Sequence, residues 1–244
     1  MKVSVICVYN DKALLDTQLL PSLYIQNIKY EFVPVDNTKN KFSSASKALN
    51  YGASIATGDI FIFSHQDIYF KTPDELRQLT QCIQSCEDGS VIGTQGVRDG
   101  SKIYYTNLTS GIKLDENLVF DYEPKKYRVS CVDEGLFGMK RTTWDTHNFD
   151  EFLCDNWHLY CVEACLYARK QGYKVYVYPS QIHHFSRGII SLSYMVGLKR
   201  LCRIYRRDFK YIWTTCYKVR TNFLYINCLV WAWIFNRFLR RNLK

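Results

Sequence analysis

The amino-acid sequence predicts an α/β fold in which a mostly parallel sheet is flanked by helices. Residues 1–67 alternate between short apolar runs and segments whose apolar residues recur at helical spacing. A continuously apolar run is typical of a strand buried on both faces of a parallel sheet. Each run ends in polar residues, and open α/β sheets bind ligands at the carboxyl ends of their strands. The pattern therefore favours a doubly wound, nucleotide-binding architecture.

The expected elements follow in order along the chain. Strands are predicted at 3–8, 31–35, 60–63, 91–97, 131–139 and 173–179, and helices at 14–26, 43–56, 72–86 and 157–171. Pro21 is expected to interrupt or cap the first helix, and Thr72 is expected to be the N-cap residue of the third. Residues 98–127 show no clear period and are expected to form an irregular excursion.

The third strand leads directly into the polar run Ser64-His-Gln-Asp. His65 and Asp67 are two residues apart, so their side chains share a face if the segment is extended. An imidazole and a carboxylate on one face can hold a divalent cation, and a cation can hold a diphosphate. The plainer alternative is a polar turn at a strand end. Because the chain has neither G-x-G-x-x-G after the first strand nor G-x-x-x-x-G-K-[ST], dinucleotide and P-loop sites are disfavoured.

Charge and cysteine usage indicate the kind of partner and compartment. The net charge is +9, but residues 198–244 alone carry twelve Lys or Arg and one acid, so the remainder of the chain is close to neutral. A basic, aromatic tail favours an anionic partner. The ten cysteines form no C-x-x-C pair, which favours a reducing compartment. The first residues enter a strand directly, so no signal peptide is expected and the predicted location is cytoplasmic.

Several ordered motifs resemble family 2 glycosyltransferases of the GT-A fold. Val3-Ser-Val-Ile-Cys-Val-Tyr-Asn is similar to their first strand, and Ser44-Ala-Ser-Lys-Ala-Leu-Asn opens a run similar to the helix before their metal-binding motif. Phe149-Asp-Glu and Ala168-Arg-Lys-Gln-Gly-Tyr-Lys-Val resemble the second half of the fold. His65-Gln-Asp is similar to a subgroup in which H-x-D replaces the usual D-x-D.

The resemblance covers about residues 1–190, which we expect to form a GT-A catalytic domain, with residues 191–244 as a basic helical segment. It implies a hexosyltransferase-type enzyme that moves a sugar from a nucleotide-diphosphate donor, UDP- or GDP-linked, to a glycan or lipid-linked acceptor. It further implies a divalent metal, Mn²⁺ or Mg²⁺, inversion at the anomeric carbon and a role in surface polysaccharide synthesis.

The resemblance also suggests roles for individual residues. Asp67 matches the last acid of D-x-D and His184 the histidine that completes the metal shell, whereas His65 is either a ligand or a ribose contact. Asp36 matches the acid that contacts the base, although it is equally a typical turn cap. The remaining residues implied to bind the nucleotide-sugar are Tyr9, Asn10, Asn37, Asn50, Asp133, Glu134 and Trp157. For Trp157, core packing is the alternative.

The catalytic base departs from the family pattern. The usual Glu-Asp pair falls on Tyr160 and Cys161, and neither is a good base unless the pKa of the thiol is lowered. Glu163 matches another acid of the same motif, and Asp155 is the second candidate; Asp133 and Glu134 are further ones. A base has to face the acceptor, so the carboxylate must point into the cleft.

The C-terminal segment allows several partners. Residues 191–210 predict a basic helix with Tyr194, Leu198, Leu201 and Tyr205 on one face. The apolar run 223–235 is too short to span the ~30 Å of a bilayer, and with its neighbouring Arg and Lys it is typical of a helix lying on anionic lipid. Packing on the catalytic domain or a homodimer seam is the alternative.

Two other functions remain open from the sequence. The missing Glu-Asp pair is compatible with an inactive nucleotide-sugar-binding relative. The basic tail is compatible with nucleic-acid binding, although we expect no nucleic-acid partner if the resemblance holds.

Overall fold

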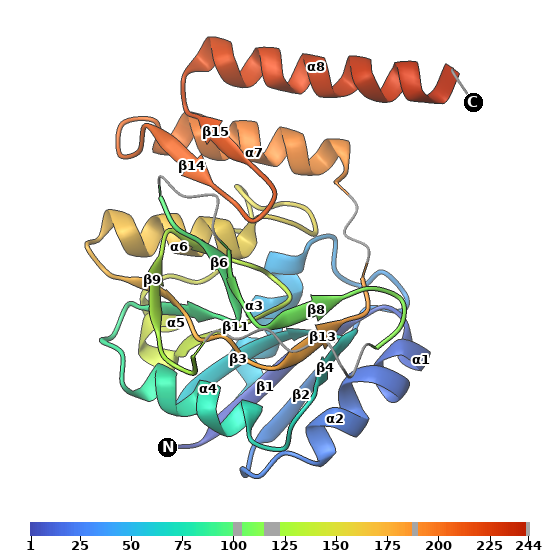
Figure 1. Cartoon of the computed structure of the whole chain (residues 1–244), viewed down its shortest axis with the longest axis vertical. Helices are drawn as coiled ribbons and strands as arrows, with labels where there is room; N and C mark the ends of the chain where they lie inside the picture. Colours follow the sequence, from blue (N-terminus) through green and yellow to red (C-terminus); the bar gives the residue numbers. More distant parts are fainter. Residues whose placement is uncertain (100–103, 115–122, 187–189, 243–244) are drawn as a thin grey trace.

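The computed structural model describes residues 1–99, 104–114, 123–186 and 190–242. Its centre is a seven-stranded sheet in the order β2-β1-β3-β11-β5-β12-β9 (Figure 1). Its strands are β1 (Val3–Tyr9), β2 (Glu31–Asp36), β3 (Ile60–His65), β5 (Val91–Gly93), β9 (Tyr127–Val129), β11 (Leu136–Lys140) and β12 (Val175–Val177). Three neighbouring pairs are parallel, and β11 and β9 run antiparallel to their neighbours. The predicted mostly parallel α/β sheet is therefore confirmed.

Helices cover both faces of this sheet because alternate residues of its central strands point to opposite sides. Ile6, Phe61 and Phe63 enter one apolar core, whereas Val5, Ile60 and Ile62 enter the other. The first core packs against α3 (Ala45–Ile55), α5 (Arg141–Thr146) and α6 (Tyr160–Lys170). The second packs against the N-terminal helix and α4 (Glu75–Gln84).

The N-terminal helix is continuous where an interruption was expected. It comprises α1 (Lys12–Leu14), a π-helical turn η1 (Leu15–Leu19) and α2 (Leu20–Tyr24). Pro21 follows shortly after the π-helical turn, a local widening of the helix at which a residue without an N–H can be accommodated. At α4 the N-cap residue is Asp74, so the expected cap at Thr72 is wrong; the Thr72 hydroxyl instead donates to Glu75 at 2.7 Å.

Two small sheets lie beside the main one. Residues 91–97, expected as one strand, divide at Thr94 between β5 and β6 (Gln95–Val97), and β6 pairs with β7 (Tyr104–Thr106) and β10 (Cys131–Val132). The other sheet has the order β4-β13-β8, from β4 (Ile68–Phe70), β13 (Ile182–His184) and β8 (Leu108–Ser110). The expected excursion at 98–127 thus contributes short strands, and parts of it lie outside the described residues.

The C-terminal segment packs on the first core. Helix α7 (Leu192–Tyr205) buries Tyr194, Leu198, Leu201 and Tyr205, as its spacing predicts. A hairpin of β14 (Tyr211–Trp213) and β15 (Lys218–Arg220) follows, which the sequence analysis did not identify. Helix α8 (Phe223–Asn242) then runs alongside α7 at the top of Figure 1. None of the helices among the described residues combines the length and apolar character needed to cross a bilayer.

A buried acid ties α7 to α6. Glu163 on α6 is only 1% exposed, accepts a hydrogen bond from the Tyr205 hydroxyl at 2.6 Å, and lies 2.9 Å from Nε2 of His147. A carboxylate taken out of water needs such partners. Glu163 therefore contributes to the attachment of the C-terminal segment.

Replacing Tyr205 with Phe removes one partner of this carboxylate with little change of shape. We expect Tyr205→Phe to lower the free energy of unfolding by about 1–3 kcal/mol, because a hydrogen bond to a buried charge is lost. The corresponding fall in Tm is roughly 2–4 °C per kcal/mol for a chain of this size. Thermal unfolding measures it, and Tyr225→Phe, an exposed tyrosine on α8, is the control. An unchanged Tm would contradict this role of Glu163.

Candidate functional site

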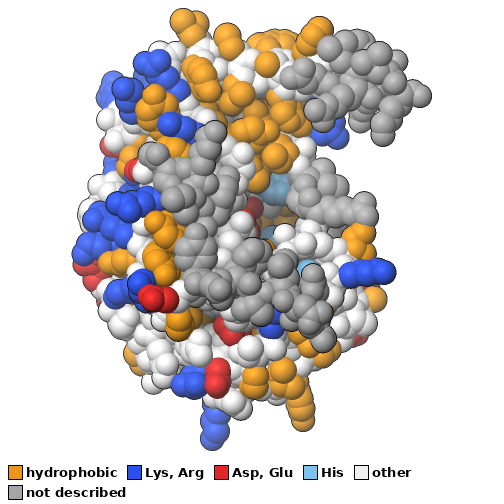
Figure 2. All heavy atoms as spheres, in the orientation of Figure 1, with side chains coloured by type: hydrophobic (Ala, Val, Ile, Leu, Met, Phe, Trp, Pro, Cys, Tyr) orange, Lys and Arg blue, Asp and Glu red, His pale blue; other side chains and the backbone are white. Residues whose placement is uncertain are grey.

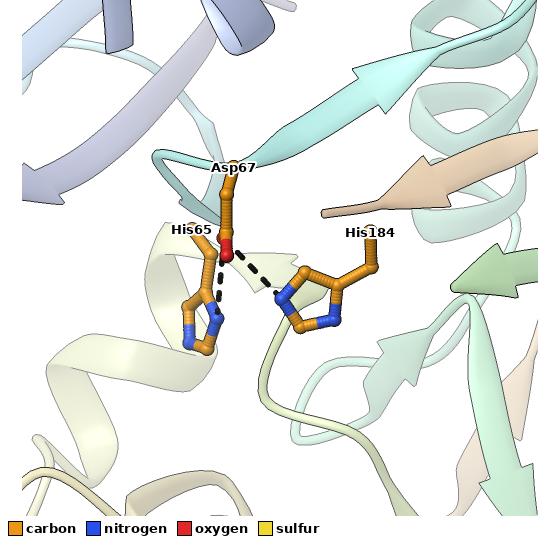
Figure 3. Close-up of side chains that lie close together, drawn as sticks. All are labelled: His65, Asp67 and His184. Atoms are coloured by element: carbon orange, nitrogen blue, oxygen red, sulfur yellow. Dashed lines mark ion pairs between the residues drawn. The ribbon is translucent and has the colours of Figure 1, made fainter. Parts of the chain in front are cut away.

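His65, Asp67 and His184 form a cluster at the carboxyl edge of the sheet. The Asp67 carboxylate lies between the two imidazole rings (Figure 3), with Oδ1 3.3 Å from His184 Nε2 and 4.0 Å from His65 Nδ1. One ligand atom from each of the three residues lies within 4.8 Å of the others. The structure therefore brings Asp67 and His184, the two residues expected at the metal, together with His65.

Strand pairing explains this arrangement. His65 ends β3, and a two-residue turn containing Asp67 leads into β4. Strand β13 pairs antiparallel with β4, in a register that sets His184 opposite Ile68, the residue after Asp67. The Phe185 N–H donates to the Asp67 carbonyl at 2.9 Å and extends the pairing. Side chains more than a hundred positions apart in the sequence thus converge.

The electrostatics of the cluster favour an ionised carboxylate. Burial opposes ionisation of Asp67, but contact with His184 outweighs it and lowers the pKa of the carboxyl. Burial likewise disfavours the charged form of His184, yet Asp67 raises its pKa. Desolvation and the neighbouring His184 lower the pKa of His65, so this imidazole is held neutral. A neutral imidazole is the form that ligates metals.

The donor set fits a divalent cation. Apart from its 3.3 Å ion-pair contact with Asp67, the buried Nε2 of His184 has no hydrogen-bond partner among the described residues, although a buried polar atom normally has one. It points toward Asp67, as Figure 3 shows. Two imidazole nitrogens and a carboxylate oxygen can hold a first-row divalent cation, and they leave coordination positions for other oxygens.

A second group of residues extends along the same edge. In the parallel register Val8 lies opposite His65 and Tyr9 opposite Asp36, so the ends of β3, β1 and β2 form a row. Asp36 accepts from the Thr38 N–H and hydroxyl at 2.8 and 2.7 Å, contacts that lower its pKa. The expected turn-capping interaction is thus present, and the carboxylate still lies at the edge.

Gln66 joins the two parts of this edge. Its side-chain oxygen accepts from the backbone N–H groups of Asn10 and Asp11 at 2.9 and 3.0 Å, and its amide donates to Asn10 Oδ1 at 2.8 Å. The middle residue of the His-Gln-Asp triplet therefore fixes the loop after β1. The sequence alone suggested no role for Gln66. Its position between His65 and Asp67 was the one feature of the sequence that could have pointed to this role.

A pocket lies beside the cluster. It is lined by Glu134, Trp157, Tyr160 and His65, with apolar side chains from β1 and α3. Trp157 is 42% exposed, so it is not core packing. The Tyr160 hydroxyl lies 3.1 Å from Nε2 of His65, a contact that the sequence did not reveal. In Figure 2, histidine surface is visible in the hollow between the sheet-containing body and the C-terminal helices.

Glu134 is held at the wall of this pocket by two adjacent residues of the loop before α6. Leu159, which precedes α6, has a φ of 73° and donates its N–H to Glu134. His158 Nδ1 lies 3.7 Å from the other carboxylate oxygen. Burial raises the pKa of Glu134, and the charge of Asp133 adds to this, whereas His158 opposes it. The carboxylate is therefore a stronger base than an exposed one.

Four other expected site residues do not point to the cluster: Asn37, Asn50, Asp155 and Glu163. Asn37 uses its side chain to bind the backbone of Phe42, and Asn50 binds the backbone at Phe149. Asp155 is 53% exposed and pairs with Arg200 at 2.9 Å. Glu163 is enclosed by His147 and Tyr205, as described above, so the structure does not bring its carboxylate to the cleft as expected. Cys161 is buried, and burial raises the pKa of its thiol, which removes it as a base.

Comparison with known proteins agrees with this geometry. A family model described as a glycosyltransferase-like family matches residues 4–185. No curated protein matches the sequence significantly. Similar solved structures include GalNAc-T7 with UDP, GalNAc and Mn²⁺ (TM-score 0.60, 15% identity, 82% of this chain and 47% of that one). Another is the mannosyltransferase PcManGT from Pyrobaculum calidifontis with GDP-Man and Mn²⁺ (TM-score 0.59, 15% identity, 86% and 65%).

A third similar structure is TarS from S. aureus in complex with UDP-GlcNAc, with a TM-score of 0.53, 16% identity, and coverage of 86% of this chain and 68% of that one. The chain spans about half to two thirds of the length of the first two structures. At these identities the likeness establishes the GT-A fold, while the family model covers most of the chain. The chain therefore belongs to the glycosyltransferase-like family and has the GT-A fold.

Proposed function

We propose that this glycosyltransferase moves a sugar from a UDP- or GDP-sugar to a glycan or lipid-linked acceptor, with inversion and with a divalent metal, in surface polysaccharide synthesis. The observation that carries the proposal is the His65–Asp67–His184 cluster at the same sheet edge as Tyr9 and Asp36. The presence of Mn²⁺ with UDP or GDP-Man in two similar structures supports it.

Tyr9, Asn10 and Asp36 would hold the nucleoside end of the donor, where the ends of β1 and β2 lie side by side. His65, Asp67 and His184 would hold Mn²⁺ or Mg²⁺. A bound divalent cation neutralises charge that grows on a leaving diphosphate. Asp133 and Glu134 would then face the sugar, because the loop that carries them adjoins both histidines. The backbone N–H of His65 donates to the Gly135 carbonyl at 2.9 Å, and Gly135 also lies against the His184 ring.

Glu134 is our proposed base among the acids of the site. The acceptor oxygen forms a bond to the anomeric carbon as the bond from that carbon to the diphosphate breaks, and the proton passes to the carboxylate. The electron pair leaves with the nucleoside diphosphate, and attack opposite the leaving group inverts the configuration. Glu134 lines the pocket beside His65, and its raised pKa suits proton uptake. Asp155 has a pKa lowered by Arg200 and is the weaker candidate.

One observation favours a second function. The position of the family's acid pair holds Tyr160, engaged with His65, and the buried Cys161. A protein that binds nucleotide-sugars without transferring them would tolerate this change. Donor binding without any donor turnover would support it.

We also propose that α8 lies on the cytoplasmic surface of a membrane. Leu224, Trp231 and Phe235 recur at helical spacing and are 72, 70 and 61% exposed, whereas Ile226 and Val230 on the other side are buried. The helix is thus apolar on its outer as well as its inner face, and a large exposed apolar face requires a partner. In Figure 2 apolar side chains gather along the top of the molecule.

A basic hollow next to α8 favours anionic lipid over a second copy of the chain. Arg206, Arg207, Lys210 and Arg220 line a hollow of about 590 Å³ that reaches Asn222, the residue before α8. Its acid, Asp208, is paired with Lys170 at 3.1 Å. Two copies of this surface facing each other would repel, whereas anionic headgroups complement it.

The metal role predicts a specific loss in Asp67→Asn. At a hundredfold excess over Kd, a bound ion stabilises a protein by about 2.7 kcal/mol, or roughly 5–10 °C here. We expect Mn²⁺ to raise the Tm of the wild type by about this amount and to leave the Tm of Asp67→Asn unchanged. The Asp67→Asn variant should also lose donor turnover. Asp155→Asn, outside the cluster, is the control and keeps the shift. Full turnover by Asp67→Asn would overturn the metal role.

The base assignment predicts a pH profile. Glu134→Gln should lower kcat by about 10²–10⁴-fold with little change in donor binding. In the wild type, kcat should fall as the pH drops through the raised pKa of Glu134, above the ordinary value of about 4.3, because a protonated carboxyl cannot accept the proton. Steady-state kinetics on Glu134→Gln and Asp155→Asn measures this. A larger loss of kcat in Asp155→Asn than in Glu134→Gln would identify Asp155 as the base.

The membrane proposal predicts selective vesicle binding. The wild type should sediment with phosphatidylcholine vesicles containing phosphatidylserine, and less with phosphatidylcholine alone or at high salt. Trp231→Glu with Phe235→Glu should abolish binding, whereas Tyr24→Glu, an 88% exposed tyrosine on α2, should not. Concentration-dependent dimerisation without vesicle binding would identify a second copy as the partner. Steeply salt-dependent binding of DNA or RNA instead would favour the nucleic-acid alternative.

A further inference from the structure

The hairpin of the C-terminal segment reaches the acids of the proposed site. The turn between β14 and β15 spans residues 214–217, and the Thr215 hydroxyl donates to Asp133 Oδ2 at 2.9 Å. The other carboxylate oxygen accepts from the Gly135 N–H at 3.0 Å. Both oxygens of Asp133 are therefore held, one of them by a segment eighty residues further along the chain.

The turn itself is braced by a network centred on Thr214. The hydroxyl oxygen of Thr214 accepts from the N–H groups of Cys216 and Tyr217 at 3.1 and 2.8 Å and from the Tyr194 hydroxyl at 2.9 Å. Tyr194 lies on α7, and its ring centroid is 5.7 Å from that of His158, the neighbour of Glu134. The turn thus has a fixed position relative to both acids.

Asp133 connects the turn with the histidine cluster. A Cβ atom built on Gly135 would lie 3.2 Å from Asp133 Oδ1 and 3.4 Å from the His184 ring, so these groups crowd the same space. The charge of Asp133 also favours the protonated form of both imidazoles: it adds to the rise in the pKa of His184, and it opposes the lowering of the pKa of His65 that burial and His184 cause. Thr215 therefore donates directly to the carboxylate that adjoins the histidine cluster.

Cys216 lies at the exposed tip of this turn. Eight of the ten cysteines are buried, and Cys216 and Cys228 are exposed. Cys216 directly follows Thr215, whose hydroxyl donates to Asp133, and its own backbone N–H donates to the Thr214 hydroxyl oxygen at 3.1 Å. The thiol is therefore carried by the part of the turn that contacts Asp133.

We propose that the 214–217 turn forms the acceptor-side wall of the transfer site, with Thr215 as a positioning residue for Asp133 and Cys216 on the surface along which the acceptor approaches. The inference rests on the proposed function. The nucleoside end lies at Tyr9 and Asp36, so the sugar and the acceptor extend from the histidine cluster toward Asp133 and Glu134. The same hairpin leads directly into α8, which brings the wall next to the proposed lipid-facing helix.

The first test separates positioning from folding at Thr215. Thr215→Val keeps the shape but loses the donor hydrogen of the bond to Asp133, whereas Thr215→Ser keeps it. With a donor found by thermal shift and Mn²⁺ present, we expect Thr215→Val to lower kcat for donor hydrolysis about 10–100-fold, the range for a hydrogen bond to a charged group. Its Tm should stay near that of the wild type, and Thr215→Ser should recover most of the rate. Equal rates in Thr215→Val and the wild type would overturn the positioning role.

The second test uses the Cys216 thiol in a Cys228→Ser background. We expect N-ethylmaleimide to modify Cys216 at least about threefold more slowly with Mn²⁺ and the complete donor than with Mn²⁺ and the nucleoside diphosphate alone, because the sugar shields the wall. Cys228 in a Cys216→Ser background is the control and should react equally in both mixtures. If both ligands protected Cys216 equally, the assignment of the 214–217 turn to the acceptor side of the site would be overturned.

A third measurement does not need a donor. A nitroxide on Cys216 should lose EPR amplitude when Mn²⁺ binds, because the dipolar effect of the ion falls steeply with distance and the 214–217 turn contacts Asp133 beside the His184 ring. A nitroxide on Cys228, which lies on α8, should lose less. The inference alone would be refuted if the wild type turned over a donor, Thr215→Val had the wild-type rate, and Cys216 responded to the ligands no more than Cys228. Protein that binds neither Mn²⁺ nor a donor would refute the proposed function, and the inference with it.

Discussion

The pairing of β13 with β4 is the constraint on which the site depends. Three residues of β13 set His184 opposite Ile68 and thereby bring its imidazole to Asp67. Without this register His65, at the end of β3, and Asp67, in the turn after it, would lack His184 as their third neighbour. The pairing also explains why Nε2 of His184 is buried without a hydrogen-bond partner among the described residues: the backbone ladder holds the ring in place while its nitrogen faces the carboxylate.

The rest of the architecture supports this edge. Alternate side chains of β1 and β3 fill two cores, so the strand ends are fixed from both faces. Along the edge, Gln66 ties the loop after β1 to the turn that carries Asp67. On the opposite side, Tyr205 and Glu163 attach α7, and α7 in turn supports the hairpin that contacts Asp133. A chain of contacts therefore connects the C-terminal segment with the cluster.

The sequence predicted the features that depend on local pattern. Apolar runs identified β1, β2 and β3, and the polar residues after them identified Asp36, His65 and Asp67. Strands of three residues such as β13, β14 and β15 are too short to show a period, so the hairpin and its Thr215 contact could not be foreseen. Helix α6 is buried over most of its length and has no clear solvent face. Its pattern therefore could not reveal that Glu163 points away from the cleft.

Leu159 couples the proposed base to the backbone that precedes α6. A leucine with a φ of 73° is in a conformation that costs of order 1–3 kcal/mol, and it is retained where surrounding contacts compensate. Its N–H donates to Glu134 and its side chain is 1% exposed. Neutralising the carboxyl weakens the acceptor that holds this peptide unit in place. The contact that holds this backbone beside Tyr160 is thus made to the same carboxylate that is proposed to take up the proton.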